Sequence, residues 1–509
     1  MRAPGWADLY SWQVDRASDT PLFRQVYLQI RSAILLRTLS PGTKLPSTRE
    51  LASRLGLARG SVISAYDQLL AEGYLSAKVG SGTHISSDLP EPIERRSPNR
   101  TKQPIGRIPQ VSVRARALEN VIAFMAESDP RPFNTGRCSV DARTVEAWRK
   151  LSHRAVRFLG PIHLGYSDAR GLIDLRKAIC DYLQAARAVR CEPEQIVVTA
   201  GTQHAIDIAI RVLLDRGVEV WVEDPCYPMV YGALASVSVK ARPIPVDAQG
   251  IDVSAGIRSA PKARAAFVTP SHQFPLGVVL SMGRRLELLA WAREAGAWII
   301  EDDYYSEFRY SGRPLASLQG LDDGNRVIYV GTLNKVLFPG LRIGYVVVPR
   351  SLLRAFVSAR YLMDRHPPSL LQTVAAEFMR QGYFAAHIRR MRLLYRDQRD
   401  ALVAELTRLA GADLLLEAPD QGMHLVAYLR DGLSDVDLEH AARQSGVIVR
   451  AVSRLYIAAP RRSALILGFT GYPRQTVLPA VGRLAQVIRE QSKRPKDGPT
   501  SYRSTRHQP

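Results

Sequence analysis

The sequence lacks the features that mark metal proteins, secreted proteins and membrane proteins. Its four cysteines form no CxxC pair in a chain of 509 residues, so neither a zinc site nor a disulfide framework is indicated. No apolar run reaches the ~18 residues needed to cross a bilayer. The first residues lack the apolar core and cleavage site of a signal peptide. We therefore expect a cytoplasmic protein with no metal and no membrane segment.

The charge of the chain is strongly one-sided, at +21. Such an excess favours polyanions such as DNA, because binding releases counterions. However, residues 1–110 hold 15 Lys or Arg against 9 Asp or Glu, and the remaining residues hold 54 against 39. The excess is therefore spread along the chain. An Arg-rich surface explains much of it, and the net charge does not by itself mark a DNA-binding site.

Length and composition predict several domains, because 509 residues exceed what a single core usually organises. Residues 88–116 contain five prolines and few large apolar residues, which is typical of an extended linker. After them, β-branched runs alternate with helical patterns, which indicates βαβ units and a mainly parallel sheet. We predict a helical domain with a hairpin over 15–87, a linker over 88–119, an α/β domain over 120–490 and a disordered basic tail over 491–509.

Within residues 15–87 the pattern predicts three helices and a hairpin. A first helix carries one apolar stripe, formed by Leu22, Val26, Ile30 and Ile34. Ser47 and Glu50 have the spacing of a capping box at the start of the second helix, and Gly56 fits its C-cap. A third helix is expected at about 59–72, and YLSAKVGSGTHIS over 74–86 reads as strand, turn and strand. This arrangement is a winged helix-turn-helix.

A helix-turn-helix pattern alone is also compatible with a small helical domain that has no nucleic-acid role. The wing and the basic residues Arg49, Arg59 and Lys78 favour DNA. The stretch LPSTRELASRLGLARGSVISAYDQLLAEGYL, followed by GSGT, closely resembles the GntR family of bacterial winged-helix regulators. The resemblance implies that Arg49 and the start of the third helix meet phosphates and major-groove bases, while the wing enters the minor groove. The DNA-binding residues it implies are Ser47, Arg49, Arg59, Gly60, Ser61, Lys78, Gly82 and Thr83.

Two positions of this segment depart from the family pattern. Ala58 stands where the family usually has a capping Ser, and Gly60 stands where a longer side chain is common. A missing N-cap costs ~0.5–2 kcal/mol, which weakens the first turn of the recognition helix in the absence of DNA.

Two stretches of the α/β region point to an anion site and to a carboxylate at a strand end. In QIVVTAGTQHAIDIAI, residues 195–210, an apolar run leads through Gly201 into a helix whose free amides suit a phosphate. In AWIIEDDYYSEF, residues 297–308, the strand delivers Asp302 at its carboxyl end, where ligands bind in α/β sheets. Such a carboxylate can keep a pyridine nitrogen protonated, and Tyr304 can hydrogen-bond a phenolic oxygen. Taken alone, EDD is equally compatible with a solvated loop.

Two further stretches bring a lysine and a ring-stacking tyrosine. In GTLNKVLFPGLRIGY, residues 331–345, Lys335 follows a strand and is flanked by Thr332 and Arg342. A hydroxyl and a guanidinium suit a phosphate, and a lysine among cations can lose its proton and form an imine. In VEDPCYPMVYGAL, Tyr227 follows a tight turn and can stack on a planar ring. A surface lysine and a core tyrosine are the ordinary alternatives.

Together and in this order, these stretches resemble the fold-type I aminotransferases, which bind pyridoxal 5′-phosphate. The resemblance implies an aldimine at Lys335, Asp302 at the pyridine nitrogen, Tyr304 at the ring oxygen and Tyr227 stacked on the ring. It assigns the phosphate to Gly201, Thr202, Thr332 and Arg342. The segment LGYSDARGLIDLR implies that Tyr166 reaches the phosphate of a neighbouring subunit in a head-to-tail homodimer, and TPSHQFPLG adds His272 and Gln273 as ring contacts.

Two residues depart from the aminotransferase pattern. Each stands next to a residue assigned to the cofactor, and neither is itself such a residue. Asn334 replaces the usual Ser before the lysine, and Cys226 replaces a usual Gly. The arginine that grips an amino-acid carboxylate is not placed by any motif. Arg450, Arg461 and Arg462 are candidates near the expected strand LILGF, 465–469.

A winged helix, a linker and an aminotransferase-like domain in one chain resemble the MocR-type subfamily of GntR regulators. The resemblance implies a bacterial transcription factor that binds double-stranded DNA and senses pyridoxal 5′-phosphate, or an amino compound, by aldimine exchange. Three alternatives remain: an active aminotransferase that carries a DNA-binding domain, a repressor whose large domain only dimerises, and an unrelated α/β enzyme with a helical appendage. The operator, the effector and the sign of regulation do not follow from the sequence.

Overall fold

The computed structural model describes residues 13–36, 38–78, 80–87, 112, 115, 129–312, 315–430, 432–458 and 461–493. The chain divides into two compact units, residues 1–110 and residues 111–509. The linker predicted over 88–119 and the tail predicted over 491–509 lie outside the described residues, except at 112, 115 and 491–493.

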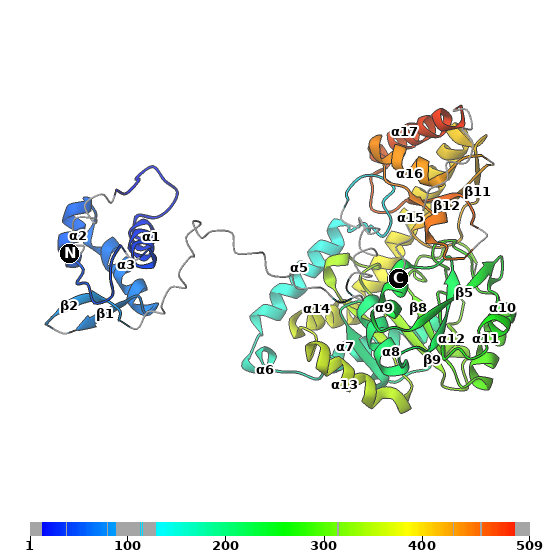
Figure 1. The fold of residues 1–509 in the computed structure, drawn as a ribbon, viewed down its shortest axis with the longest axis horizontal. Coiled ribbons are helices and arrows are strands. Elements are labelled where there is room, and N and C mark those ends of the chain that lie inside the picture. Colours follow the sequence, from blue (N-terminus) through cyan, green and yellow to red (C-terminus); the bar gives the residue numbers. More distant parts are fainter. Residues whose placement is uncertain are drawn as a thin grey trace, which may run out of the picture. The chain divides into compact units, whose positions relative to one another are not determined.

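The N-terminal unit is a three-helix winged helix (Figure 1). Its elements are α1 (Leu22–Leu35), α2 (Thr48–Leu55), α3 (Arg59–Ala71), β1 (Leu75–Lys78) and β2 (Gly82–Ile85). The Ser47 side chain accepts a hydrogen bond from the Glu50 amide at 3.2 Å, and Gly56 ends α2 in the left-handed region at φ 62°. The strands pair antiparallel, with Lys78 opposite Gly82. The predicted helices and wing are therefore confirmed.

One apolar core holds this unit together. The stripe of α1 contributes Val26, Ile30 and Ile34, all buried, while Leu22, expected in the same stripe, is only half-buried. Leu51 and Leu69 pack against them from α2 and α3. Apolar burial is the main driving force of folding, so this core is what holds the three helices together.

The large unit is built on an eight-stranded sheet of mixed direction. Its strands lie in the order β3-β10-β9-β8-β7-β4-β5-β6. In chain order they are β3 (Ile196–Thr199), β4 (Glu219–Asp224), β5 (Lys240–Asp247), β6 (Gly250–Ile251), β7 (Ala265–Val268), β8 (Trp298–Asp303), β9 (Val327–Thr332) and β10 (Gly344–Val347). The five neighbouring strands β9, β8, β7, β4 and β5 run parallel, as the mainly parallel sheet predicts.

Strand β10 departs from the parallel pattern, because it pairs antiparallel with both β9 and β3. Only residues 333–343 connect β9 to β10. A parallel pair needs a crossover of a dozen or more residues, usually a helix, so the short connection turns the chain back. The same connection carries Lys335.

Helices cover both faces of the sheet (Figure 1). One face packs on α8, α9 and α13, and the other on helices that include α7 and α11. The helices before the C-terminal part are α5 (Ala142–Arg157), α6 (Pro161–Leu164), α7 (Ile173–Arg187), α8 (Thr202–Leu213), α9 (Pro228–Ser236), α10 (Val253–Ser259), α11 (Met282–Glu294), α12 (Leu318–Leu321), α13 (Leu353–Asp364) and α14 (Ser369–Arg380).

The C-terminal part of the large unit forms a smaller layer of its own. An antiparallel sheet in the order β11-β12-β14-β13 packs with the last helices. Its elements are α15 (Tyr383–Ala410), β11 (Leu414–Leu416), β12 (His424–Leu429), α16 (Asp435–Gln444), β13 (Arg450–Ala451), the 3₁₀ turn η5 (Ser453–Leu455), β14 (Ala464–Gly468) and α17 (Arg474–Ser492). The strand expected at 465–469 is β14, one residue earlier.

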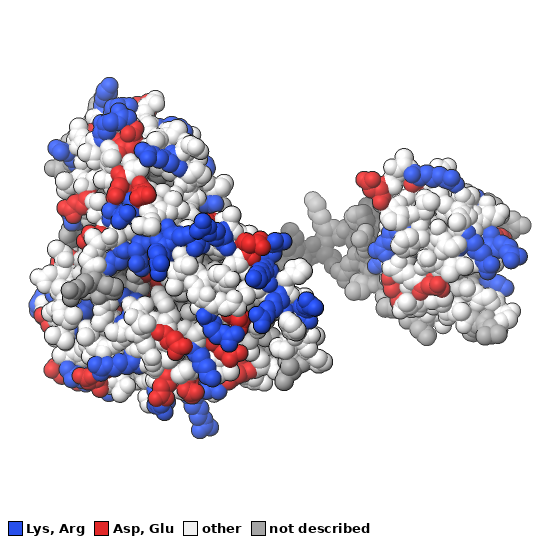
Figure 2. Space-filling model, turned by 180° about the vertical axis from the view of Figure 1, so that it is seen from behind, with Lys and Arg blue, Asp and Glu red and all other residues white. Residues whose placement is uncertain are grey.

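Basic side chains are spread over both units (Figure 2). On the face shown, a belt of Lys and Arg crosses the large unit, and acidic side chains lie beside it. The net charge therefore does not single out the N-terminal unit, which agrees with the distribution along the sequence.

Candidate functional site

A cavity of about 200 Å³ lies where strands β8 and β9 end and helices α8 and α9 begin. Most of the residues predicted to hold a cofactor line this cavity. They are Gly201, Thr202, Tyr227, Asp302, Tyr304, Thr332, Lys335 and Arg342, together with Arg450 from the set of candidate arginines. Sequence positions more than 200 apart thus meet in one place.

Asp302 reaches the cavity because β8 is an apolar strand that ends on acidic residues. It pairs in register with Val330 of β9 and is only 5% exposed. Burial, together with the carboxylates of Asp303 and Glu223, raises the pKa of Asp302 well above its usual range. Its Oδ1 atom is buried and has no hydrogen-bond partner among the described residues. Burying such a group without a partner is costly, so the site suits a ligand that brings a hydrogen-bond donor.

Lys335 lies in the connection between β9 and β10, three residues after the end of β9, and its side chain is half-buried. A Cβ atom added at Gly136 would lie 2.6 Å from its Nζ. A residue larger than glycine at position 136 would therefore displace the Lys335 amine from this place. The thiol of Cys138 contacts the Lys335 carbonyl oxygen at 3.1 Å, which fixes the loop from the same side.

The start of α8 forms a cradle for an anion. Gly201 adopts φ 115°, and α8 begins at Thr202 with no side-chain cap. A Cβ atom at Gly201 would lie 2.7 Å from Asn334 Nδ2 and 3.7 Å from a guanidinium nitrogen of Arg342. A helix N-terminus with uncapped amides, a glycine and a facing guanidinium is the arrangement that binds phosphate in many proteins.

Asn334, which departs from the family pattern, ties this cradle to the sheet. Its side-chain Oδ1 accepts a hydrogen bond from the Ile343 backbone amide at 2.8 Å, and its backbone amide donates to Thr332 Oγ1 at 3.1 Å. The departure therefore has a structural role in the β9–β10 connection. The other departure, Cys226, is buried at 2% exposure.

The aromatic residues that line the cavity are Tyr227, Phe274, Tyr304 and Tyr305. Tyr227 makes an edge contact with Phe274 at 5.7 Å between ring centroids. The Tyr304 hydroxyl donates to the His272 carbonyl oxygen at 2.9 Å, so its proton is engaged in this state. Tyr305, which the motif analysis missed, also lines the cavity.

Three residues implied by the resemblance are not among those that line the cavity. His272 and Gln273 are buried beside it, and the Gln273 amide donates to the Pro225 and Phe274 carbonyl oxygens at 2.7 Å each. Tyr166 is 80% exposed and lies against His366, at 5.8 Å between ring centroids. Its predicted contact is with a second subunit, so it stays a prediction.

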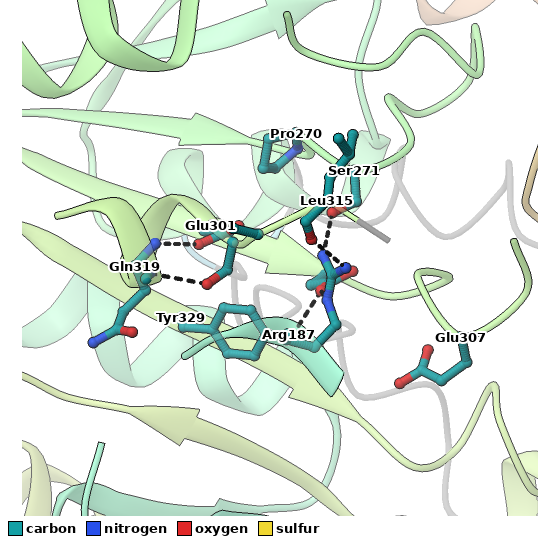
Figure 3. A network of polar contacts seen from close by, with 12 residues as sticks. Arg187, Pro270, Ser271, Glu301, Glu307, Leu315, Gln319 and Tyr329 are labelled. Atoms are coloured by element: carbon teal, nitrogen blue, oxygen red, sulfur yellow. Dashed lines mark hydrogen bonds and ion pairs between the residues drawn. The ribbon is translucent and has the colours of Figure 1, made fainter. Parts of the chain in front are cut away.

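A buried polar network supports the strand end that carries Asp302 (Figure 3). Arg187 from the end of α7 forms an ion pair with Asp303 at 2.8 Å, and the Tyr329 hydroxyl donates to the same carboxylate at 2.7 Å. Arg187 also donates to Ser271 Oγ and to the Leu315 carbonyl oxygen. Burial alone would lower the pKa of Arg187, but Asp303 and its neighbours raise it. No sequence motif identified this network.

Glu301, the residue before Asp302 on β8, also supports this end of the strand through hydrogen bonds. It accepts hydrogen bonds from the amides of Leu318 and Gln319, at 2.9 and 3.0 Å, and thus holds the start of α12 (Figure 3). Burial raises the pKa of Glu301 to about 7.

The predicted DNA-binding residues of the N-terminal unit lie on its surface. Arg49, Arg59 and Gly60 are exposed, and Arg59 Nε contacts Thr48 Oγ1 at 3.3 Å. Helix α3 begins at Arg59 after Ala58, which offers no side-chain cap. The side chain of Lys78 lies outside the described residues.

The wing brings in one basic residue that the sequence motifs did not point to. Lys44 forms a β-bridge with His84 of the wing and is exposed. A Cβ atom at Gly82, where φ is 98°, would lie 3.0 Å from its side chain. Lys44 therefore lies beside Gly82 on the surface that the GntR pattern assigns to DNA.

In comparisons with known proteins, the two units match two different families. Residues 130–478 match the aminotransferase class I and II family, and residues 22–85 match the gntR family of bacterial regulatory proteins. Over nearly the full length, the chain is 38% identical to the probable rhizopine catabolism regulatory protein MocR of Rhizobium meliloti, covering 93% of this chain and 95% of that protein. It belongs to the MocR-type subfamily of GntR regulators.

Other MocR-type relatives and aminotransferase structures agree with this assignment. The pyridoxine biosynthesis regulator PdxR of Corynebacterium glutamicum is 31% identical over 92% of this chain and 96% of its own. Among solved structures, a multiple substrate aminotransferase from Thermococcus profundus superimposes with TM-score 0.66 and 28% identity, over 75% of this chain and 96% of that one. A MocR-type regulator thus joins a DNA-binding winged helix to an aminotransferase-like domain of a pyridoxal-phosphate-dependent family.

In this MocR-type chain, none of the described helices is long and apolar enough to cross a membrane. Residues that motif analysis missed include Gly136, Tyr305, Glu439 and Arg454 in the cavity lining, and Arg187 behind it. Gly136 follows the turn-rich stretch FNT, which is a signal too common to be specific.

Proposed function

We propose that this chain is a transcriptional regulator whose large unit holds pyridoxal 5′-phosphate as a Schiff base with Lys335. The observation that carries the proposal is the convergence of Lys335, Asp302 and the Gly201 cradle in one cavity, where Asp302 Oδ1 has no hydrogen-bond partner in the described part of the chain. When bound, the cofactor supplies an electrophilic carbon that exchanges one amine for another.

Each group of the cavity suits one part of that cofactor. Asp302 would hold the pyridine nitrogen in its protonated form, Tyr304 would serve the ring oxygen, and Tyr227 would stack on the ring. Gly201, Thr202, Thr332 and Arg342 would hold the phosphate. These roles fit Asp302 Oδ1, which is buried with no partner in the described ranges, and Gly201, whose added Cβ would fill the cradle.

The regulatory step is the exchange of the amine at this Schiff base. With the cofactor bound, its electrophilic carbon would let the primary amine of an effector take the place of Lys335. Lys335 would accept the two protons that the incoming nitrogen gives up, and would then be a free amine. The signal is either the arrival of the cofactor or this exchange, provided that the two states differ in geometry.

The signal reaches DNA through a homodimer, in which the large domains pair head to tail and Tyr166 enters the neighbouring site. What supports a dimer is a groove between α5, α6 and α14 with exposed apolar side chains at its edge. Val156, Phe158 and Leu164 line it, at 58%, 67% and 76% exposure. Large exposed apolar patches mark interaction surfaces. Sedimentation of the purified protein tests this: a monomer at micromolar concentration contradicts it.

The N-terminal unit binds the operator through α3 and the wing, with Ser47, Arg49, Arg59, Gly60, Ser61, Lys78, Gly82 and Thr83 at the interface. Two copies on paired half-sites would bind more tightly than one, because the first contact raises the effective concentration of the second.

Absorbance and reduction with borohydride test the cofactor site. The wild type loaded with pyridoxal 5′-phosphate should show the Schiff-base band, and reduction should label a peptide that contains Lys335. Lys335→Ala should lose both signals, whereas Lys240→Ala, a control at an exposed strand lysine, should keep them. Persistence of the band in Lys335→Ala contradicts the proposed role. Operator binding measured with and without cofactor then tests the coupling.

An active aminotransferase is the second candidate, because Lys335, Asp302 and the Gly201 cradle line one cavity. The chain is also 25% identical, over 75% of its length, to the aromatic-amino-acid aminotransferase 1 of Thermococcus litoralis. Multiple turnovers with an amino donor and a keto acid would favour this candidate, and a single stoichiometric exchange would favour the regulator.

A further inference from the structure

The first long described stretch of the large unit contacts Lys335. We call residues 132–144 the entry segment, because they follow the predicted linker in the sequence and lead into α5. A Cβ atom added at Gly136 would meet Lys335 Nζ at 2.6 Å, and the Cys138 thiol lies 3.1 Å from the Lys335 carbonyl oxygen. The chain that comes from the DNA-binding unit therefore contacts the lysine soon after it enters the large unit.

A buried histidine of α15 joins the Lys335 loop to the entry segment. His387 Nε2 lies 2.9 Å from the Val336 carbonyl oxygen, and His387 Nδ1 lies 2.8 Å from Thr144 Oγ1. Burial lowers the pKa of His387, so the ring is neutral and carries one proton. Because a carbonyl oxygen only accepts, that proton is on Nε2, and Nδ1 accepts from the Thr144 hydroxyl. His387 thus connects the residue after Lys335 to the first turn of α5.

Two more side chains of α15 hold the entry segment. Arg390 donates to Asp141 Oδ1 and to Thr144 Oγ1, at 3.1 Å each. Since the Thr144 oxygen accepts from Arg390, its own proton is available for the imidazole. Asp141 in turn accepts from the Thr144 backbone amide at 2.8 Å, and the Tyr395 hydroxyl accepts from the Ser139 amide at 2.7 Å. The entry segment is therefore fixed to α15 at three points.

The other end of the entry segment is bound to the C-terminal layer. The Phe133 carbonyl oxygen accepts from the Gly468 amide at 2.8 Å, and the Pro132 carbonyl oxygen accepts from the Ile448 amide at 2.9 Å. Gly468 ends β14, and Ile448 precedes β13. Within a few residues the entry segment is thus attached both to this layer and to the Lys335 loop. Small shifts in such packed segments are passed on, because close packing leaves little room to absorb them.

The Lys335 loop also has attachments of its own to the large sheet. Asn334 bonds the Ile343 amide through its side chain and Thr332 Oγ1 through its backbone. These hydrogen bonds do not involve the entry segment. Removing the contact through His387 should therefore release the entry segment and leave Lys335 in the cavity.

We propose that His387 and Thr144 form a relay between Lys335 and the linker. They tie the entry segment to the Lys335 loop, so a change at the Lys335 amine shifts the chain that leads to the winged helix. This inference rests on the proposed function, because a cofactor must bind at Lys335. Both are positioning residues, since neither lines the cavity. The relay carries a signal only if the loop differs in geometry between the loaded and the cofactor-free protein.

Hydrogen exchange of the full-length protein tests the relay without any variant. Residues at the start of α5 do not line the cavity, so a bound cofactor does not cover their amides directly. These amides should exchange about 3- to 10-fold more slowly in protein loaded with pyridoxal 5′-phosphate, as one strengthened hydrogen bond allows. Amides of α10, which packs in another part of the core and has no residue in the cavity, should not change. Equal exchange at the start of α5 in both states, in a protein that shows the Schiff-base band, overturns the inference.

A pair of substitutions at Thr144 separates the hydroxyl from the packing. Thr144→Val keeps the shape but removes the donor to His387, whereas Thr144→Ser keeps the hydroxyl. Operator affinity is measured with and without pyridoxal 5′-phosphate, on a DNA duplex that the wild type selects from a random pool. In the wild type and Thr144→Ser the two affinities should differ by about 5-fold or more, the usual size of such coupling. In Thr144→Val they should agree within about 2-fold, while the Schiff-base band remains. His387→Phe, which removes both contacts of the ring, should behave like Thr144→Val.

Two results with these variants would overturn the inference while leaving the proposed function intact. One is a full cofactor-dependent difference in operator affinity in Thr144→Val and His387→Phe. The other is loss of that difference in Thr144→Ser as well, because packing rather than the hydroxyl would then carry the coupling. If Thr144→Val does not fold, the exchange experiment on the wild type decides. Failure of the proposed function itself looks different, since the wild type would then show no Schiff-base band or no cofactor-dependent operator affinity.

Discussion

The two units of this protein carry their functional residues in opposite ways. In the N-terminal unit, the residues assigned to DNA fall between Ser47 and Thr83, and Arg49, Arg59 and Gly82 are exposed. In the large unit, the cavity draws on residues from Thr135 to Leu455, and its key carboxylate Asp302 is 5% exposed. The residues assigned to DNA lie on a surface, whereas the cavity of the large unit is lined by residues from its interior.

This difference predicts how each site responds to change. A surface arginine can be replaced with little effect on folding, because water solvates what remains. A residue behind the cavity acts through the position of others, as Arg187 does through Asp303. The comparison implies that substitutions in the large unit mainly change stability and cofactor binding, while those in the N-terminal unit change DNA affinity directly.

The largest effect is expected for Arg187→Met. Removing one partner of a buried ion pair leaves an uncompensated charge and costs about 3–5 kcal/mol, so the free energy of unfolding of the large unit should fall by that amount. Denaturant titration followed by fluorescence measures it. The matched control is Arg190→Met, whose pair with Asp323 is 67% and 77% exposed and should contribute about 0–1 kcal/mol. Equal losses in both variants would contradict the distinction between interior and surface.

The interior should also respond to pH, through carboxyl groups kept neutral by burial. Burial raises the pKa of Glu223 to about 7. A carboxyl whose pKa is raised in the folded state stabilises the protein at low pH. That contribution is lost as the pH rises from about 4.5 to 7, by up to about 3 kcal/mol.

Glu223→Gln isolates this contribution in the cofactor-free protein. The variant cannot titrate at this position, so its free energy of unfolding should fall less than that of the wild type between pH 5 and pH 8. The variant must be compared with the wild type because other groups titrate too. Burial lowers the pKa of His204 and His424 to about 4, and this makes the folded state more stable as the pH rises. Parallel pH curves would show that Glu223 does not contribute.

The surface of the N-terminal unit should respond in affinity instead. Arg49→Ala should weaken operator binding by about tenfold and reduce the salt dependence by about one phosphate contact. Its thermal stability should not change, because Arg49 is exposed. Fluorescence anisotropy at several salt concentrations measures both quantities, with Arg190→Met of the large unit as the control. Unchanged affinity and slope would remove Arg49 from the interface.

The smallest effect is expected at the start of α3. Ala58 occupies the N-cap position without a side-chain hydrogen bond, so Ala58→Ser should add a cap and stabilise the N-terminal unit by ~0.5–1 kcal/mol. The matched loss is Ser47→Ala, which removes the bond to the Glu50 amide. A variant pair with no change in melting temperature would show that these caps are replaced by water.

Sequence reasoning recovered the N-terminal unit almost completely, because each of its signals is local. A capping serine, a C-cap glycine and a GSG turn act on the backbone within a few residues. It also placed Asp302 at the end of β8 and Lys335 shortly after the end of β9, because an apolar strand followed by polar residues is visible in the sequence.

The parts that sequence reasoning missed depend on distant contacts. Gly136 matters only because Lys335 lies against it, 199 positions later in the sequence. Arg187 reads as an ordinary basic residue at the end of a helix, and its partner Asp303 is not visible from that position. Arg454 and Glu439 come together only after β13 pairs with β14.

The sequence by itself therefore determined the order of helices and strands, the winged helix and the residues that stand at strand ends. Local patterns of apolar residues, caps and turns specify these features through short-range physics. Tertiary structure alone decided which of these residues share a cavity, that the buried Asp302 Oδ1 finds no hydrogen-bond partner among the residues the structure describes, and that Glu439 faces Arg454 beside this cavity. Burial and charge pairing depend on what packs around a residue, and that environment comes from segments hundreds of positions away.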